Sequence, residues 1–238
     1  MYKLNQQDYV LLNKAEELFP GRRITERFQK CAALPKKQRY DYVLSEMARL
    51  PRQGLIRIGM TIAQSLLSHT ENMMSLASND KERKMCQVHD MPEALTTDFC
   101  HVDVGTKARK RTKIALENLA AKIIFKDDMK AYRLWHEYED RQSDTSEKIK
   151  DIDMLEWKIA CDQYNEIFVY APNIRENLED FRAKATQTCI DRNIDESAYG
   201  KSDIKLDNYD HQGGDNFNAT LPNHHDEQKQ IGPQPQHP

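Results

Sequence analysis

Glycine is scarce in this sequence. Of 238 residues only eight are glycine, and four of these precede residue 200: Gly21, Gly54, Gly59 and Gly105. Tight hairpins between β-strands depend on glycine, because it readily adopts the positive φ angles that such turns require. So few turn residues over this length predict a chain of helices rather than a many-stranded fold.

The sequence also lacks the marks of several classes of protein. No apolar run approaches the roughly 18 residues that cross a membrane, and the first residues have no apolar signal core. The formal net charge of -3 provides no basic surface for non-specific nucleic-acid binding. The five cysteines form no CxxC pair, so neither a disulfide framework nor a structural zinc site is indicated. We expect a cytoplasmic protein without a membrane or nucleic-acid partner.

Apolar residues recur at helical spacing through most of the chain. Ser78-Asn79-Asp80 supplies a helix N-cap, and residues 51–54 are predicted to form a turn. The polar segment 198–238 has too few large apolar groups to offset its ordering entropy. We expect one all-α domain over residues 1–197 and a disordered tail over 198–238. The predicted helices are short ones within 1–40 and longer ones over about 39–50, 61–77, 81–89, 105–125, 130–141, 147–170 and 173–191.

One histidine–aspartate doublet carries the chemistry of the predicted folded part. His89 and Asp90 are adjacent, so an imidazole nitrogen and a carboxylate oxygen can both reach one divalent cation. Such a dipeptide is common by chance, and its weight comes from context. His69 lies on the preceding predicted helix, and Asp153 lies on an apolar helix where a carboxylate needs a partner or a metal. For Asp153, a salt bridge with a nearby lysine or arginine is the alternative.

Together these motifs resemble the HD-domain 5'-deoxynucleotidases. The likeness spans about residues 40 to 170, and its most specific part is the block 88–99, where Glu93 and Asp98 both fall in register with the doublet. The other stretches stand in the same order as in that family: Leu50-Pro51-Arg52-Gln53-Gly54, His69, and Ile152-Asp153-Met154-Leu155-Glu156.

The resemblance implies an all-α fold with a five-helix HD core, which the helices before residue 50 would cover on one side. It also implies one divalent cation (Mn, Co, Fe, Ni, Zn or Mg), whose identity the ligand types leave open. Related proteins are often homo-oligomers, and the aromatic helix 130–141 is one candidate contact surface. The implied metal ligands are His69, His89, Asp90 and Asp153.

The same resemblance assigns roles to the remaining motif residues. Glu93 matches an acid that orients or deprotonates water beside the metal, so Glu93 and Asp90 are the predicted catalytic residues. Arg52 matches an arginine that holds the substrate phosphate. Asp98 matches an acid near the 3'-hydroxyl of deoxyribose. The predicted activity is removal of phosphate from deoxynucleoside 5'-monophosphates.

Several positions depart from the family pattern. Ser68 stands where the family has an acid before the first histidine, and the spacing from His69 to His89 is shorter than usual. Leu55 replaces a tryptophan, and Thr97 replaces a glycine. The last two changes touch the region that recognises sugar and base, so they leave the substrate more open than the reaction type.

Two alternatives remain from the sequence. The basic cluster of residues 107–113 either reaches further phosphate groups or is a solvated helix face; its members are Lys107, Arg109, Lys110, Arg111 and Lys113. In the first case the chain is a dNTP triphosphohydrolase or a signalling-nucleotide hydrolase with the same metal site. The second alternative is a non-catalytic helical interaction protein with a vestigial HD site.

Overall fold

The computed structural model of the chain describes residues 1–60, 63–167 and 172–199. Within these ranges the chain is helical, and the only β-type pairing is an isolated antiparallel bridge between Pro51 and Ser65. The predicted all-α class is therefore confirmed. The predicted disordered tail falls, from residue 200 onward, outside the described residues.

The helices agree with the predicted ones over most of the chain, although residues 168–170 of the predicted helix 147–170 fall outside the described ranges. Asn79, inside the predicted cap, accepts a hydrogen bond from the Glu82 amide and starts α6. The elements in chain order are α1 (Gln6–Leu18), α2 (Ile24–Ala33), α3 (Lys36–Arg49), α4 (Gln53–Arg57), α5 (Leu66–Leu76), α6 (Asp80–His89), α7 (Glu93–Thr96), η1 (His101–Val104), α8 (Lys107–Ile124), α9 (Met129–Glu139), α10 (Asp144–Ile167), α11 (Pro172–Asp191) and η2 (Glu196–Ala198).

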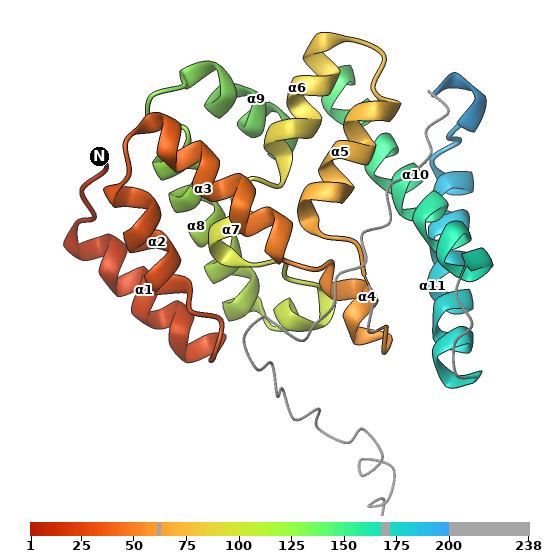
Figure 1. The fold of residues 1–238 in the computed structure, drawn as a ribbon, viewed down its shortest axis with the longest axis horizontal. Helices are drawn as coiled ribbons and strands as arrows, with labels where there is room; N and C mark the ends of the chain where they lie inside the picture. The colour runs from red at the N-terminus through yellow and green to blue at the C-terminus, as the bar shows by residue number, and fades with distance from the viewer. Residues whose placement is uncertain (61–62, 168–171, 200–238) are drawn as a thin grey trace, which may run out of the picture.

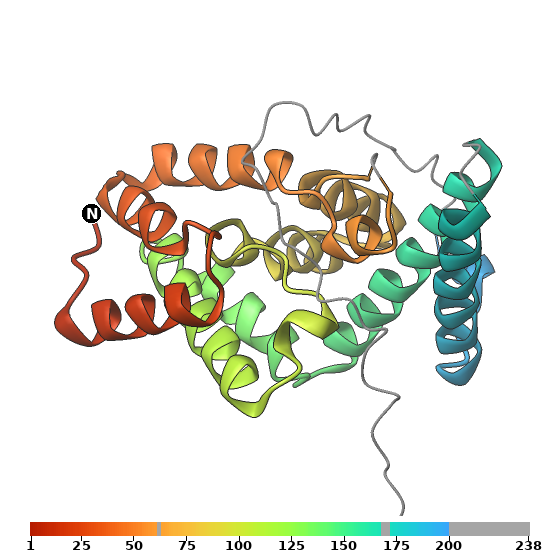
Figure 2. The ribbon, with the colours of Figure 1, turned by 90° about the horizontal axis from the view of Figure 1, so that it is seen from below.

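The helices form a bundle between two terminal helix pairs. Figure 1 shows α1 and α2 at one end and the α10–α11 pair at the other, and the view from below shows the same separation (Figure 2). Between them, α5 packs on α3, α6 and α10, and α9 packs on α6 and α10. Helix α8 packs on α1, α2 and α7. None of the described helices combines the length and hydropathy needed to span a bilayer.

Two apolar cores hold this arrangement. The larger one runs through α1 to α3, α5 to α9 and the first half of α10, and includes Phe28, Met73 and Ile152. The smaller one joins α4 and α11 to the second half of α10, around Tyr164 and Leu178. The chain therefore passes from the larger core at Leu50 into the smaller core at α4, where α11 packs against it.

The start of α5 differs from the predicted helix 61–77. Residues 61 and 62 lie outside the described residues, and the helix begins only at Leu66, where the Ser65 hydroxyl accepts the Ser68 amide at 3.1 Å. The preceding amides and carbonyls pair instead with the segment after α3: Leu66 N donates to Leu50 O at 2.7 Å and Arg52 N to Gln64 O at 3.0 Å. Apolar spacing could not show this long-range pairing. Residues 53–57 also form the short helix α4, where a turn was predicted for 51–54.

Candidate active site

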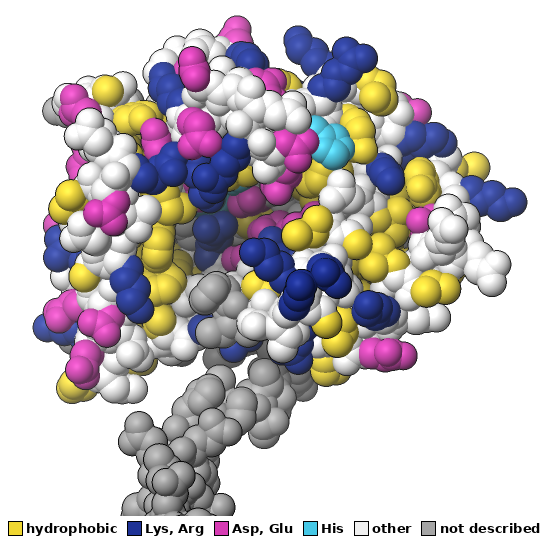
Figure 3. Space-filling model, turned by 180° about the vertical axis from the view of Figure 1, so that it is seen from behind, with side chains coloured by type: hydrophobic (Ala, Val, Ile, Leu, Met, Phe, Trp, Pro, Cys, Tyr) yellow, Lys and Arg dark blue, Asp and Glu magenta, His cyan; other side chains and the backbone are white. Residues whose placement is uncertain are grey.

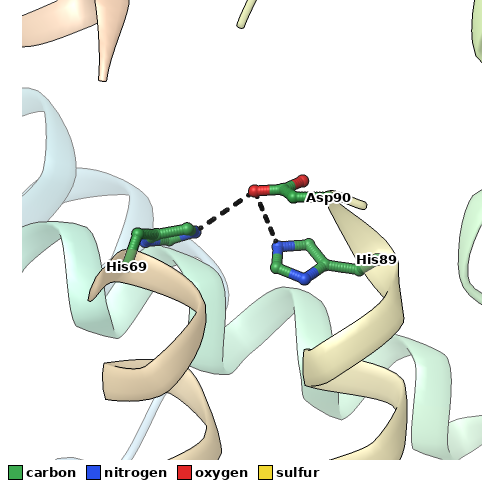
Figure 4. Close-up of side chains that lie close together, drawn as sticks. All are labelled: His69, His89 and Asp90. Carbon is green, nitrogen blue, oxygen red and sulfur yellow. Dashed lines mark ion pairs between the residues drawn. The ribbon is translucent and has the colours of Figure 1, made fainter. Parts of the chain in front are cut away.

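Three predicted ligands meet where α5 begins and α6 ends. His69 lies inside α5, His89 is the last residue of α6, and Asp90 caps that helix. Figure 4 shows their side chains pointing toward one another. Asp90 Oδ2 lies 3.0 Å from His89 Nε2 and 3.6 Å from His69 Nε2. One donor atom from each residue lies within 4.8 Å of the other two, which is close enough for all three to hold one ion.

The two imidazoles are oriented by their other ring nitrogens. His69 Nδ1 lies 2.6 Å from Glu156 Oε2, and His89 Nδ1 lies 2.6 Å from the Cys86 carbonyl oxygen. Both Nε2 atoms are buried and have no hydrogen-bond partner among the described residues. Buried polar atoms are rarely left unpaired, and metal-binding histidines typically donate their second nitrogen to a carboxylate or a carbonyl. A divalent cation therefore fits between the two Nε2 atoms and Asp90.

Asp153 borders this trio from α10. Its Oδ1 lies 3.4 Å from His69 Nε2, and its Oδ2 lies 2.5 Å from Lys150 Nζ. Oδ1 thus lies near the other predicted ligands, and Oδ2 makes the salt bridge with a lysine that was the alternative. Asp153 remains a candidate fourth ligand through Oδ1.

A buried glutamate supports the site, and no role was predicted for it. Glu156 is completely buried, and its carboxylate accepts hydrogen bonds from Gln64 Nε2 and Asn72 Nδ2, each at 3.1 Å, in addition to contacting His69. Glu156 follows Asp153 by three residues and shares its helix face. Two carboxylates at this spacing on an apolar helix were the signal that could have identified it.

The electrostatics of the site favour a cation. Burial raises the pKa of Asp90 and Asp153, but the neighbouring His89 and Lys150 charges outweigh it and hold both pKa values below their usual range. Burial and the charge of Arg52 lower the pKa of His69, yet Glu156 and Asp153 raise it to about 9. The neighbouring carboxylates favour positive charge at His69 Nε2. A proton and a metal ion would compete for this nitrogen.

A pocket opens beside the histidines. The face opposite to that of Figure 1 has a recess in which acidic and basic side chains gather (Figure 3). The cavity has a volume of about 310 Å³, within the range of small-molecule sites. Of the residues predicted for the site, only His69 is absent from its lining. Sequence reasoning assigned no site role to Tyr138, Glu139, Arg141 and Lys150, which also line it.

Arg52 and Glu93 stand next to the ligand cluster. Arg52 Nη1 lies 3.3 Å from Asp90 Oδ2. Glu93, the first residue of α7, has a buried Oε2 without a hydrogen-bond partner among the described residues. Burial, followed by the Asp90 and Asp98 charges, raises the pKa of Glu93 well above its usual range, while Lys113 at 3.9 Å partly offsets them. A carboxyl whose pKa is raised in this way is suited to donate a proton.

Asp98 reaches the pocket from the segment after α7. Its Oδ2 accepts the backbone amide of Gln53 at 2.9 Å, which ties it to the residue that follows Arg52. The preceding residue, Thr97, has a φ of 74°. The structure thus brings Arg52, Glu93 and Asp98 to the same pocket as His89, Asp90 and Asp153.

This constellation is that of a known class. A model of the HD domain family matches residues 59–190, more than half of the chain. The chain belongs to the HD domain family and is a hydrolytic phosphohydrolase, which confirms the predicted class of enzyme. HD domains depend on a metal, and His69, His89 and Asp90 form a possible site for one.

Relatives with assigned activities match about half of the chain. The 5'-deoxynucleotidase HDDC2 of Danio rerio is 29% identical over 135 residues, covering 52% of this chain and 68% of the relative. That of Xenopus laevis is 27% identical over 137 residues, covering 52% and 67%. Among solved structures, the PH0347 protein of Pyrococcus horikoshii OT3 has a TM-score of 0.48 at 21% identity, covering 63% of this chain and 94% of its own.

Proposed function

We propose that the chain is a metal-dependent 5'-deoxynucleotidase that converts deoxynucleoside 5'-monophosphates into nucleosides and inorganic phosphate. The observation that supports this most directly is the pair of buried Nε2 atoms that face Asp90 and have no hydrogen-bond partner among the described residues. The names of the HDDC2 relatives give the substrate class.

Each pocket residue has a part in this reaction. A bound divalent cation supplies charge that polarises the phosphate and makes a water molecule more acidic. Arg52 binds the phosphate oxygens with its planar donors. Water attacks phosphorus, the bond from phosphorus to the 5'-oxygen breaks, and Glu93 gives its proton to that leaving oxygen. The proton that the attacking water releases then returns to Glu93. Asp98 accepts a hydrogen bond from the 3'-hydroxyl and orients the sugar.

The basic cluster 107–113 gives little support to a triphosphate substrate. Of its five residues only Lys113 lines the pocket. Its ammonium lies 2.5 Å from Glu117, so its charge is already compensated. A monophosphate therefore fits better, and the dNTP or signalling-nucleotide reaction becomes an outcome of the test.

A substrate screen with metal analysis tests the proposal. The purified chain is stripped of metal, reloaded separately with Mn²⁺, Co²⁺, Zn²⁺ or Mg²⁺, and supplied with dNMPs, NMPs and dNTPs. We expect inorganic phosphate from dNMPs, lower rates with NMPs, and no activity without metal. Triphosphate released from dNTPs would indicate the alternative hydrolase. No metal uptake and no product from any nucleotide would indicate the non-catalytic interaction protein.

A further inference from the structure

One buried arginine, from outside the segment that matches the HD family, reaches the turn that carries Asp98. Residues 1–58 precede that match. The chain turns sharply between α1 and α2, where Gly21 has a φ of +80° and Arg23 a φ of 51°. Arg22 stands between them and is only 8% exposed. The turn therefore directs Arg22 into the protein rather than toward solvent.

Arg22 contacts the segment that carries Asp98 at several points. Its Nη1 donates to Thr97 Oγ1 at 2.7 Å and lies 3.3 Å from the carbonyl oxygen of Asp98. Its Nη2 lies 2.9 Å from Asp103 Oδ1, and its guanidinium carbon lies 4.8 Å from the centre of the Phe99 ring. One side chain thus holds residues 97, 98, 99 and 103 together. The planar guanidinium of arginine has several hydrogen-bond donors and can make these contacts together, whereas a lysine ammonium is a single point charge.

The residue that Arg22 binds is one that would not adopt this conformation alone. Thr97 has φ 74° and ψ 158°, a region that only glycine adopts readily, and its side chain is β-branched. Such a conformation persists only when the surroundings enforce it. The hydrogen bond from Arg22 to the buried Thr97 hydroxyl is one such constraint, and the Thr97 amide, which donates to Glu93 O at 2.7 Å, is another.

The conformation of Thr97 sets the position of the next residue, Asp98. The Asp98 carboxylate lines the pocket and accepts the Gln53 amide. A change of backbone angles at Thr97 would move this carboxylate and release Gln53, which neighbours Arg52. Arg22 itself is not part of the pocket lining.

We propose that Arg22 is a positioning residue, which holds the Thr97–Asp98 turn so that Asp98 meets the sugar of the substrate. The inference rests on the proposed nucleotidase function for its kinetic consequence. It assigns a functional role to the helices α1 and α2, which lie outside the matched family segment.

Kinetics on the full chain test the proposal. We expect Arg22→Ala to raise KM for a dNMP about tenfold, because a charged hydrogen bond that orders the binding group is lost, while kcat stays within about twofold. Arg22→Lys should fall between, since it keeps the charge but not the fork. The control Arg23→Ala removes an exposed arginine that pairs with Glu26 on the surface, and its KM should not change.

A double-mutant cycle separates this role from simple stabilisation. If Arg22 acts through Asp98, then Arg22→Ala should raise KM little further in a chain that already carries Asp98→Ala. A merely structural role would instead lower the active fraction and the melting temperature in both backgrounds and leave KM unchanged. An unchanged KM for Arg22→Ala, or full additivity with Asp98→Ala, would overturn the proposal.

Hydrogen–deuterium exchange provides a readout that needs no substrate. Arg22→Ala should increase exchange of the backbone amides in residues 97–104 relative to wild type and to Arg23→Ala. If the wild-type chain hydrolyses no nucleotide, the proposed function fails, and this measurement still decides whether Arg22 holds the turn. Unchanged exchange over residues 97–104 would refute the positioning role on its own.

Discussion

The two sides of the pocket are held in different ways. On the proposed metal side, His69, His89, Asp90 and Asp153 come from the helices α5, α6 and α10, or directly follow one of them. On the substrate side, Arg52 and Asp98 lie on short connecting segments. Packing of α5, α6, α9 and α10 on one another fixes the metal side. The substrate side depends on distant residues: Arg22, which precedes the family match, and Phe181 on α11, which lies within it.

This difference indicates where the protein can change. Helices packed in one core keep their ligands in register even when surface residues vary. The position of a connecting segment can depend on a single distant residue. Of the four departures from the family pattern, Leu55 and Thr97 lie on the substrate side, whereas Ser68 and the shorter spacing from His69 to His89 lie on the metal side. The following predictions test the comparison from the largest expected effect to the smallest.

Loss of a ligand on the metal side should have the largest effect. Asp153→Ala or Asp90→Ala should lower kcat by about a thousandfold or more, because several kcal/mol of transition-state stabilisation depend on the cation. Circular dichroism should show unchanged helix content, and elemental analysis should show lost metal. The matched control is Asp151→Ala. Asp151 lies on α10 like Asp153 but pairs with Arg192, so this variant should keep wild-type activity. Full activity of either ligand variant would exclude that residue as a ligand.

The second largest effect should come from removing the carboxylate that orients His69. Glu156→Gln should weaken metal affinity about 10- to 100-fold, because the carboxylate that orients His69 becomes a neutral amide. Activity should return at saturating metal, in contrast to Asp153→Ala. Metal titration by calorimetry measures the shift, with the exposed Glu166→Gln on the same helix as control. Equal affinity in wild type and Glu156→Gln would show that His69 needs no such support.

Disturbing the substrate side through α11 should have a smaller and different effect. A β-carbon on Gly54 would lie 2.9 Å from Phe181 Cζ, closer than such atoms normally approach. We expect Gly54→Ala to raise KM about fivefold, since Arg52 moves, and to leave metal affinity unchanged. Phe181→Leu in the same chain makes room and should restore part of the loss. A drop in metal affinity would mean that the two sides are not independent.

The smallest effect concerns stability away from the pocket. Burial raises the pKa of Glu82, but Lys148 and the amide of Ser78 outweigh it, so the pKa lies below the usual 4.5. The charged form is therefore favoured in the folded state. Its contribution is present above pH 4.5 and is lost as the pH falls through the lowered pKa. Glu82→Gln should reduce the free energy of unfolding by about 1 kcal/mol at pH 7 and by much less near pH 3. Urea unfolding at both pH values measures the difference, and an equal loss at both would contradict it.

Some expectations are still predictions. These are one domain over residues 1–197, self-association through the helix 130–141 and a cytoplasmic location. Size measurements in solution, together with limited proteolysis, would address the first two. The roles of the individual site residues rest on the variants described above.

The sequence by itself determined the helical class, most helix positions and the chemical identity of the candidate ligands. These depend on local spacing: the stripes of α8 to α11, the cap at Asn79, and the His89-Asp90 doublet are all readable within a few turns of chain. Only the tertiary structure decided that α5 begins at Leu66, that Glu156 orients His69, and that Arg22 reaches Thr97. Each of these rests on contacts between residues more than ten positions apart, whose geometry is set by how the helices pack and not by the periodicity of any one of them.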